Sequence, residues 1–211
     1  MKRLLKGGSA LFVLCLISAC GMNNYAENSL ARKNITIRST HTFVQCHSYG
    51  CKNKSDITFT NKDWTQIAGH FSPAPGSADQ ERRAIALSIG DFERLIGDKN
   101  GSSSDKGGTF RRMMAGGLQL DCVDESINTT IYLQLLNKKD FLHFHDTGAP
   151  AVRLPVIHAG RWPHQTATII EKQTGARFAV DSWFHDNGFP AEIIPLKNWK
   201  NGWKPNTILQ H

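Results

Sequence analysis

Residues 121–137 read DCVDESINTTIYLQLLN and decide the fold class of this chain. Within them, apolar side chains recur at every fourth position, at Val123, Ile127, Ile131 and Leu135. That spacing places them on one face of a helix, so the segment predicts a helix over roughly 123–137. Cys122 therefore lies at the start of a helix.

The start of this helix can be capped in two ways. Asp121 can cap it with Asp124 in the third position, or Cys122 can occupy the cap with Glu125 third. Either arrangement brings the Cys122 sulfur near the positive end of the helix dipole, which favours the thiolate. The three acidic neighbours raise the thiol pKa if they point at it. A strong nucleophile at this position therefore needs a nearby imidazolium.

Four runs rich in β-branched and aromatic residues follow the helix and predict strands. They are residues 153–158, 165–171, 177–184 and 192–196. Turn residues separate them, and Thr174 and Gly175 favour a hairpin between the second and third runs. One helix followed by antiparallel strands is an α+β pattern, and we assign residues 109–211 to the core domain.

The upstream region predicts a small N-terminal lobe over residues 34–97. Its clearest helix is expected from Ala78 to Ile96, with Ser77 and Gln80 as a capping box and Gly97 as the stop. It is preceded by a short strand at 57–60 and a helical turn capped by Thr60 and Asp63. Residues 98–108 are rich in glycine, serine, lysine and aspartate, which predicts a flexible loop.

The chain has five cysteines. Cys46 and Cys51 are close enough in sequence to form a disulfide across a tight loop, which is the usual fate of such pairs outside the cytoplasm. A metal site with His47 as a third ligand is the alternative for this pair. Cys15 and Cys20 belong to the N-terminal hydrophobic run, which leaves Cys122 as the unpaired thiol.

The first nineteen residues have the features of an export signal. Positive charges precede a short apolar stretch, residues 10–17, which is too short to span a bilayer. The sequence Ile-Ser-Ala-Cys-Gly at 17–21 resembles the lipobox of bacterial lipoproteins. That resemblance implies cleavage before Cys20, lipidation of Cys20 by diacylglycerol and an acyl chain such as palmitate, and a tether over residues 20–33. An ordinary secretory signal with Cys20 near the cleavage site is the alternative.

Lipidation would anchor the chain to a bacterial membrane, and Gly21 after the cysteine favours the outer membrane, with the protein facing the periplasm. The net charge of +7 falls to +4 when the signal, with its Lys2, Arg3 and Lys6, is removed (7 − 3 = 4). Lysine and arginine are scattered, without a basic stripe or zinc-finger spacing, so we expect no nucleic-acid partner. We also expect no cofactor. The sequence does not indicate an oligomeric state.

Two residues on the predicted hairpin complete a candidate site. His164 begins the first arm and Asp181 lies near the end of the second, so folding at the turn brings them nearly opposite each other. A carboxylate at that distance can orient an imidazole and stabilise its protonated form. Asp186 is the rival third member. Each of the three residues also has a purely structural interpretation: Cys122 as a buried thiol, His164 as a structural histidine and Asp181 as a turn residue.

Further polar residues were weighed for supporting roles. The backbone N–H of Cys122 is the expected oxyanion donor, with Gln119, Trp162 and Trp183 as possible side-chain donors. His143 and His145 would face the same way on an extended strand, and His158 and His164 bracket a loop. None of these histidines has the spacing of a zinc set, so we expect no metal site.

A cysteine at a helix start, a histidine 42 residues on and an aspartate another 17 on resemble the transglutaminase-like cysteine peptidase superfamily, whose members share a papain-like core. Residues 148–153 resemble the helix-to-strand passage of that core, and the likeness covers about 119–183. It implies Cys122 as nucleophile, His164 as general base and Asp181 as its orienter.

The activity implied by this resemblance is acyl transfer from an amide through a thioester, resolved by water or by an amine. Protein or cell-wall peptides are the expected substrates. A non-catalytic envelope lipoprotein that uses the same fold for binding or assembly is the alternative.

Overall fold

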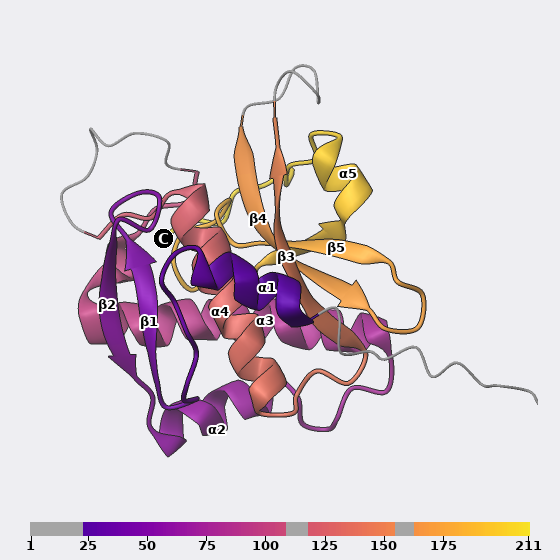
Figure 1. Cartoon of the computed structure of the whole chain (residues 1–211), viewed down its shortest axis with the longest axis horizontal. Coiled ribbons are helices and arrows are strands. Elements are labelled where there is room, and N and C mark those ends of the chain that lie inside the picture. Colours follow the sequence, from indigo (N-terminus) through magenta and orange to yellow (C-terminus); the bar gives the residue numbers. More distant parts are fainter. Residues whose placement is uncertain (1–22, 109–117, 155–162) are drawn as a thin grey trace, which may run out of the picture.

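The computed structural model of the chain describes residues 23–108, 118–154 and 163–211 (Figure 1). In chain order the elements are α1 (Asn23–Ala31), β1 (Thr42–His47), β2 (Asn53–Thr58), α2 (Asn61–Gly69), α3 (Ala78–Asn100), the 3₁₀ turn η2 (Ser102–Ser104), α4 (Cys122–Lys138), β3 (His145–Arg153), β4 (His164–Glu171), β5 (Arg177–Asp181), β6 (Glu192–Pro195) and α5 (Leu196–Lys200). The expected signal peptide and the proposed lipidation site, Cys20, lie outside the described residues, as do His158 and Trp162.

Two antiparallel sheets combine with the helices, which confirms the α+β class. One sheet pairs β1 with β2, and the other has the strand order β3-β4-β5-β6. The hairpin at Thr174 and Gly175 is present, because β4 pairs with β5 from Ala167 opposite Val180 to Ile170 opposite Arg177. This hairpin carries His164 at one end of β4 and Asp181 at the end of β5.

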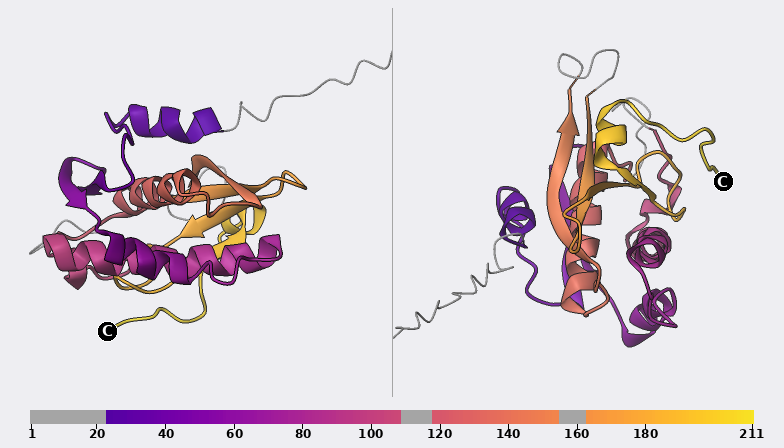
Figure 2. Two further views of the ribbon diagram at one scale, coloured as in Figure 1. Left: turned by 90° about the horizontal axis from the view of Figure 1, so that it is seen from below. Right: turned by 90° about the vertical axis from the view of Figure 1, so that its right-hand side faces the viewer.

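Helix α4 lies at the centre of the molecule. Figure 2 shows α1 on one side of α4 and the larger sheet, with α2 and α3 on the other side. Every residue of α4 from Asp124 to Leu136 is buried. The polar side chains of this helix are therefore inside the protein and must find partners there.

The larger of two hydrophobic clusters joins the two halves of the chain. The rings of Phe92 on α3 and Tyr132 on α4 stack with centroids 4.8 Å apart, and Ile85, Ile169 and Val180 belong to the same buried cluster. The boundary expected between an N-terminal lobe at 34–97 and a separate core domain has no counterpart in this packing.

Helix α1 corrects the expectation of a tether over residues 20–33. Ala26 and Leu30 of α1 are buried, and the helix packs on β3 and α4. The segment shows little amphipathic pattern because few of its side chains reach the core, so sequence periodicity could not reveal it.

Helix α3 continues past Gly97, where the sequence predicted its end. Gly97 is required inside the helix because the backbone of Ser103 packs against it, and a Cβ there would lie 2.8 Å from that backbone. The actual stop is Gly101, which adopts φ +88°. The expected flexible loop at 98–108 is instead the end of α3, the turn η2 and a segment anchored by Asp105, whose Oδ1 accepts the N–H of Leu120 (2.7 Å).

The strand expected at 153–158 is also misplaced. The observed β3 lies earlier, at His145–Arg153, and pairs with β4 across a bulge between Gly148 and Ala151. Residues 155–158 lie outside the described part of the chain. Across the three described ranges, no helix is long and apolar enough for a membrane span.

Candidate functional site

The structure brings His164 and Asp181 together inside the protein. His164 Nε2 lies 2.8 Å from Asp181 Oδ2, and the two side chains are 0% and 1% exposed. Asp181 is acceptor-only when ionised, so Nε2 carries the hydrogen and the neutral ring has its lone pair on Nδ1. That Nδ1 is buried and has no hydrogen-bond partner among the described residues.

Aromatic rings surround this pair. The His164 ring lies 4.6 Å from Trp183, 5.4 Å from Phe184 and 5.4 Å from Trp199, measured between ring centroids. Trp199 on α5 also donates its indole N–H to Asp181 Oδ2 over 2.6 Å. The carboxylate is thus held by two donors, and the rings exclude water from the histidine–aspartate bond, which strengthens it.

Trp199 is a site residue that no pattern in the sequence singles out. Its indole lies 18 residues beyond Asp181 and reaches it because α5 follows β6, the partner strand of β5. No sequence motif marks such a contact.

Cys122 is the first residue of α4 and is a half-buried free thiol. Of the two capping arrangements, the structure adopts the one centred on Asp121. Asp121 Oδ1 accepts the N–H groups of Val123 (3.0 Å) and Asp124 (2.8 Å), and Asp124 accepts the N–H of Asp121 in return. Cys122 is therefore inside the first turn and not the cap itself.

Strand β4 reaches Cys122 at the residue that follows His164. The backbone N–H of Gln165 lies near the Cys122 sulfur and lowers the pKa of the thiol. Gln165 is opposite Val152 on β3, and pairing between β4 and β5 begins only at Ala167. The side-chain amide of Gln165 donates to Ser126 Oγ on the next turn of α4 (2.6 Å) and holds the start of β4 on the helix.

Among the described residues, no hydrogen bond joins the Cys122 sulfur to the His164 ring. His164 and Gln165 are successive residues of β4, so their side chains point to opposite faces of the strand. Gln165 contacts Ser126 of α4, whereas the His164 ring lies among Trp183, Phe184 and Trp199. The contact between thiol and imidazole that catalysis would need is therefore not formed in this structure.

Burial raises the pKa of the Cys122 thiol to about 11. The N–H of Gln165 lowers this pKa, whereas the negative charges of Asp121 and Asp181 raise it further. The helix dipole therefore does not produce a thiolate in this state, because burial of the thiol outweighs it.

Two buried glutamates, Glu125 and Glu93, lie next to Ser182, the residue that follows Asp181. Glu125 on α4 accepts a hydrogen bond from Ser182 Oγ (2.5 Å), and its carboxyl group contacts that of Glu93 on α3. Burial raises the pKa of Glu125 to about 7 and that of Glu93 well above its usual value. The charge of Glu125 raises the pKa of Glu93 further, whereas the hydrogen bond with Glu93 lowers the pKa of Glu125. Two carboxyl groups in contact must share a proton, so this pair links α3, α4 and the residue after Asp181.

The disulfide Cys46–Cys51 is formed, as expected, and the loop that it closes packs against the N-terminal end of α4. The N–H groups of Tyr49 (2.8 Å) and Cys51 (2.6 Å) donate to the carboxylate of Asp124, and that of Gly50 donates to Asp121 (3.1 Å). The loop residues adopt positive φ, which turns successive N–H groups toward one side. The carboxylates of Asp121 and Asp124 therefore accept hydrogen bonds mainly from backbone N–H groups.

Two other candidates have different roles. Asp186, the rival third member, forms an ion pair with Lys106 (2.7 Å) and accepts the N–H of Gly107 (2.9 Å). Gln119 donates to the carbonyl of Ser104 (2.9 Å) and accepts the N–H of Lys106 (3.1 Å), so its side chain is not free to act as an oxyanion donor.

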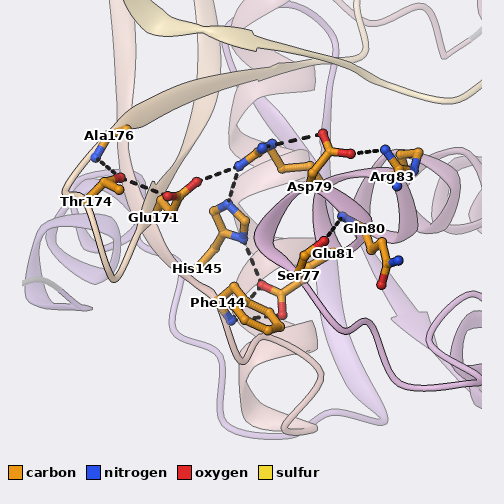
Figure 3. Close-up of polar contacts among 11 residues, drawn as sticks. Ser77, Asp79, Gln80, Glu81, Arg83, Phe144, His145, Glu171, Thr174 and Ala176 are labelled. Carbon is orange, nitrogen blue, oxygen red and sulfur yellow. Dashed lines mark hydrogen bonds and ion pairs between the residues drawn. The ribbon is translucent and has the colours of Figure 1, made fainter.

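A second histidine–carboxylate pair lies elsewhere in the molecule (Figure 3). His145 Nδ1 bonds Glu81 (2.8 Å), and Arg82 lies 3.2 Å from its Nε2 and 2.7 Å from Glu171. Both ring nitrogens are thus occupied, and the network ties α3 to β3 and β4. Within the described ranges, no group of three or more histidine, cysteine or acidic side chains is arranged to hold a metal.

A cavity of about 440 Å³ adjoins the aromatic rings of the site. Trp183 and Phe184 form one wall, and Lys204 and Ile208 from the C-terminal segment contribute another. The cavity is large enough for an apolar portion of a ligand beside Trp183 and Phe184, and His164 is not among its lining residues.

Comparison with protein-family models, curated proteins and solved structures found no match to this chain.

Proposed function

We propose that the protein is a thiol hydrolase or acyltransferase that acts on amide bonds of proteins or cell-wall peptides. Cys122 is the nucleophile, His164 the general base and Asp181 its orienter. The observation that carries the proposal is the buried His164 ring, bonded to Asp181 through Nε2 and left without a partner at Nδ1. A buried nitrogen without a partner is costly in a purely structural histidine.

The reaction proceeds by two acyl transfers. His164 Nδ1 takes the proton of Cys122 as the sulfur attacks the carbonyl carbon, and the imidazolium gives that proton to the departing amine as the C–N bond breaks. The thioester that remains is attacked by water or by an amine, which His164 deprotonates. The free thiol is then regenerated. Water yields hydrolysis, and an amine yields transamidation.

The tetrahedral oxyanion has two backbone donors within reach. The N–H groups of Cys122 and Gln165 both contact the Cys122 sulfur and lower its pKa. An oxygen that develops on the carbon bonded to this sulfur would lie close to the same groups. This assignment keeps the Cys122 N–H expected from the sequence and adds Gln165 in place of Gln119.

The wider setting of this proposal comes from the sequence. A papain-like or transglutaminase-like core agrees with a nucleophile at the start of a central helix and a histidine–aspartate pair on the adjacent sheet. A lipid anchor at Cys20 would hold the protein in the bacterial envelope, facing the periplasm, where protein and cell-wall peptides are accessible.

The test is acylation of the full chain by 4-nitrophenyl hexanoate. We expect a burst of about one 4-nitrophenolate per protein and a hexanoyl group on the Cys122 peptide by mass spectrometry. Cys122→Ser should abolish both, and His164→Ala should slow the burst by roughly 100-fold. His41→Ala, at an exposed position, is the matched control. A burst that survives in Cys122→Ser would contradict the proposal.

The second candidate is a binding or assembly module without catalysis. The raised pKa of Cys122 favours it, because a thiol with a pKa of about 11 is almost fully protonated at neutral pH. The two candidates differ in one result. If His164→Ala acylates as fast as the wild-type chain, the histidine takes no proton and the binding module is the better account.

A further inference from the structure

A small cavity is lined in part by Gln165. Its volume is about 190 Å³, and it is lined by Ser29, Arg32, Lys33, Ile127, Pro150, Val152 and Gln165. The residues come from the end of α1, from α4 and from the starts and ends of the paired strands β3 and β4. Ile127, Pro150 and Val152 make an apolar floor, and the two basic residues stand at the rim.

Gln165 is shared by this cavity and the candidate nucleophile. Its backbone N–H contacts the Cys122 sulfur, while its side chain lines the cavity and bonds Ser126 Oγ on α4 (2.6 Å). Ser126 lies one helical turn from Cys122 on the same face of α4, so the cavity and the candidate nucleophile are close along this helix.

The cavity is positively charged. Arg32 donates to Ser29 Oγ (3.0 Å), and Lys33 donates to the carbonyl of Gly50 (2.9 Å). Both partners are neutral, and none of the lining residues is acidic. Within the described parts of the chain, neither cation forms an ion pair, so their charge is available to an external anion.

We propose that this cavity is a subsite for a carboxylate of the acyl donor next to the bond that Cys122 attacks. Arg32 and Lys33 bind the carboxylate, and the apolar floor takes the methylene groups that lead to it. The volume is below that of pockets for drug-sized ligands, which are about 300–1,000 Å³, so the subsite suits one acidic residue. This inference rests on the proposed function and specifies its substrate class.

The test compares two activated esters of equal chain length. The 4-nitrophenyl monoester of adipate ends in a carboxylate, and 4-nitrophenyl hexanoate ends in a methyl group. The second-order rate constants for acylation of Cys122 are measured for both, with the Cys122→Ser background subtracted. Their ratio reports recognition of the carboxylate, because the reacting ester is the same in both compounds.

We expect the full chain to prefer the adipate ester and Arg32→Gln to lower that preference by roughly two- to fivefold, the size typical of one exposed ion pair. The rate with hexanoate should stay unchanged. Arg38→Gln removes the same charge from an exposed position outside this cavity and should leave the ratio unaltered.

Three results would overturn the subsite, and they are distinguishable from one another. An unchanged ratio in Arg32→Gln removes the carboxylate contact while the thiol chemistry stands. If Arg38→Gln lowers the preference for the adipate ester as much as Arg32→Gln does, the preference arises from the overall positive charge of the surface and not from this cavity. Failure of both esters to acylate Cys122 overturns the proposed function, and the subsite with it.

Discussion

The backbone N–H of Cys51 donates a hydrogen bond to Asp124 Oδ1 over 2.6 Å. This contact joins the disulfide loop to the first turn of α4, where Asp124 also completes the capping box with Asp121. Cys122 lies between these two aspartates in the sequence. The position of the candidate nucleophile therefore depends on a loop more than 70 residues upstream.

Breaking the disulfide should loosen that loop and the start of α4 together. We expect Cys46→Ser/Cys51→Ser to lower the free energy of unfolding by about 2 kcal/mol and to slow Cys122 acylation. Urea denaturation and the ester burst measure the two effects. Reduction should destabilise the wild-type chain and leave the double variant unaffected. An equal effect of reductant on both proteins would contradict this prediction.

Asp181 has two opposed effects that a single substitution should separate. Its charge raises the pKa of Cys122, and in the proposed reaction it would also stabilise the imidazolium of His164, to which it is hydrogen-bonded. In Asp181→Asn we expect the thiol pKa to fall below about 11, visible as faster iodoacetamide labelling near pH 9. Ester acylation should nevertheless slow by at least roughly tenfold. A thiol pKa that rises in this variant would refute the electrostatic account.

Trp199→Phe removes the indole donor to Asp181 and keeps an aromatic ring beside His164. A hydrogen bond to a charged group contributes about 1.5–3 kcal/mol, so we expect a loss of stability in that range by urea denaturation at pH 7. Trp203→Phe is the matched control, because Trp203 contacts the ring of Phe184 and not Asp181. Equal losses in the two variants would show that packing alone explains the effect.

Stability should decrease from about pH 5 to pH 9 because of the carboxyl groups buried behind the site. Glu125 and Asp105 have folded-state pKa values raised to about 7 and about 8, above the unfolded values of about 4. A raised pKa stabilises the fold fully below the unfolded pKa, and the contribution is lost as pH rises through the folded pKa. Thermal melting at several pH values measures this slope.

Glu125→Gln should flatten that decline, since an amide can accept the hydrogen bond of Ser182 and carries no charge at high pH. Glu27→Gln, at an exposed position on α1, is the control and should keep the wild-type slope. In strongly acidic solution stability should instead fall as the pH decreases, because hydrogen bonds hold the pKa of Glu81 and Asp186 below their usual range. Stability is therefore expected to be greatest in mildly acidic solution.

The sequence alone determined the elements whose signals are local. Helix α4, the capping of α2 by Thr60 and Asp63, and the hairpin between β4 and β5 were all predicted, and the Asp121–Asp124 cap of α4 was one of two predicted alternatives. So was the disulfide. Each depends on residues a few positions apart, where spacing and side-chain chemistry limit the backbone to a few conformations.

Only the tertiary structure decided which of these elements meet. It placed the Gln165 N–H at the Cys122 sulfur, the Trp199 indole on Asp181, and helix α1 on the sheet where a tether was expected. It also brought the N–H groups of Tyr49 and Cys51 in the disulfide loop to the carboxylate of Asp124. Contacts between segments far apart in sequence depend on how a whole core packs, and burial then sets the pKa values, so no local pattern encodes them.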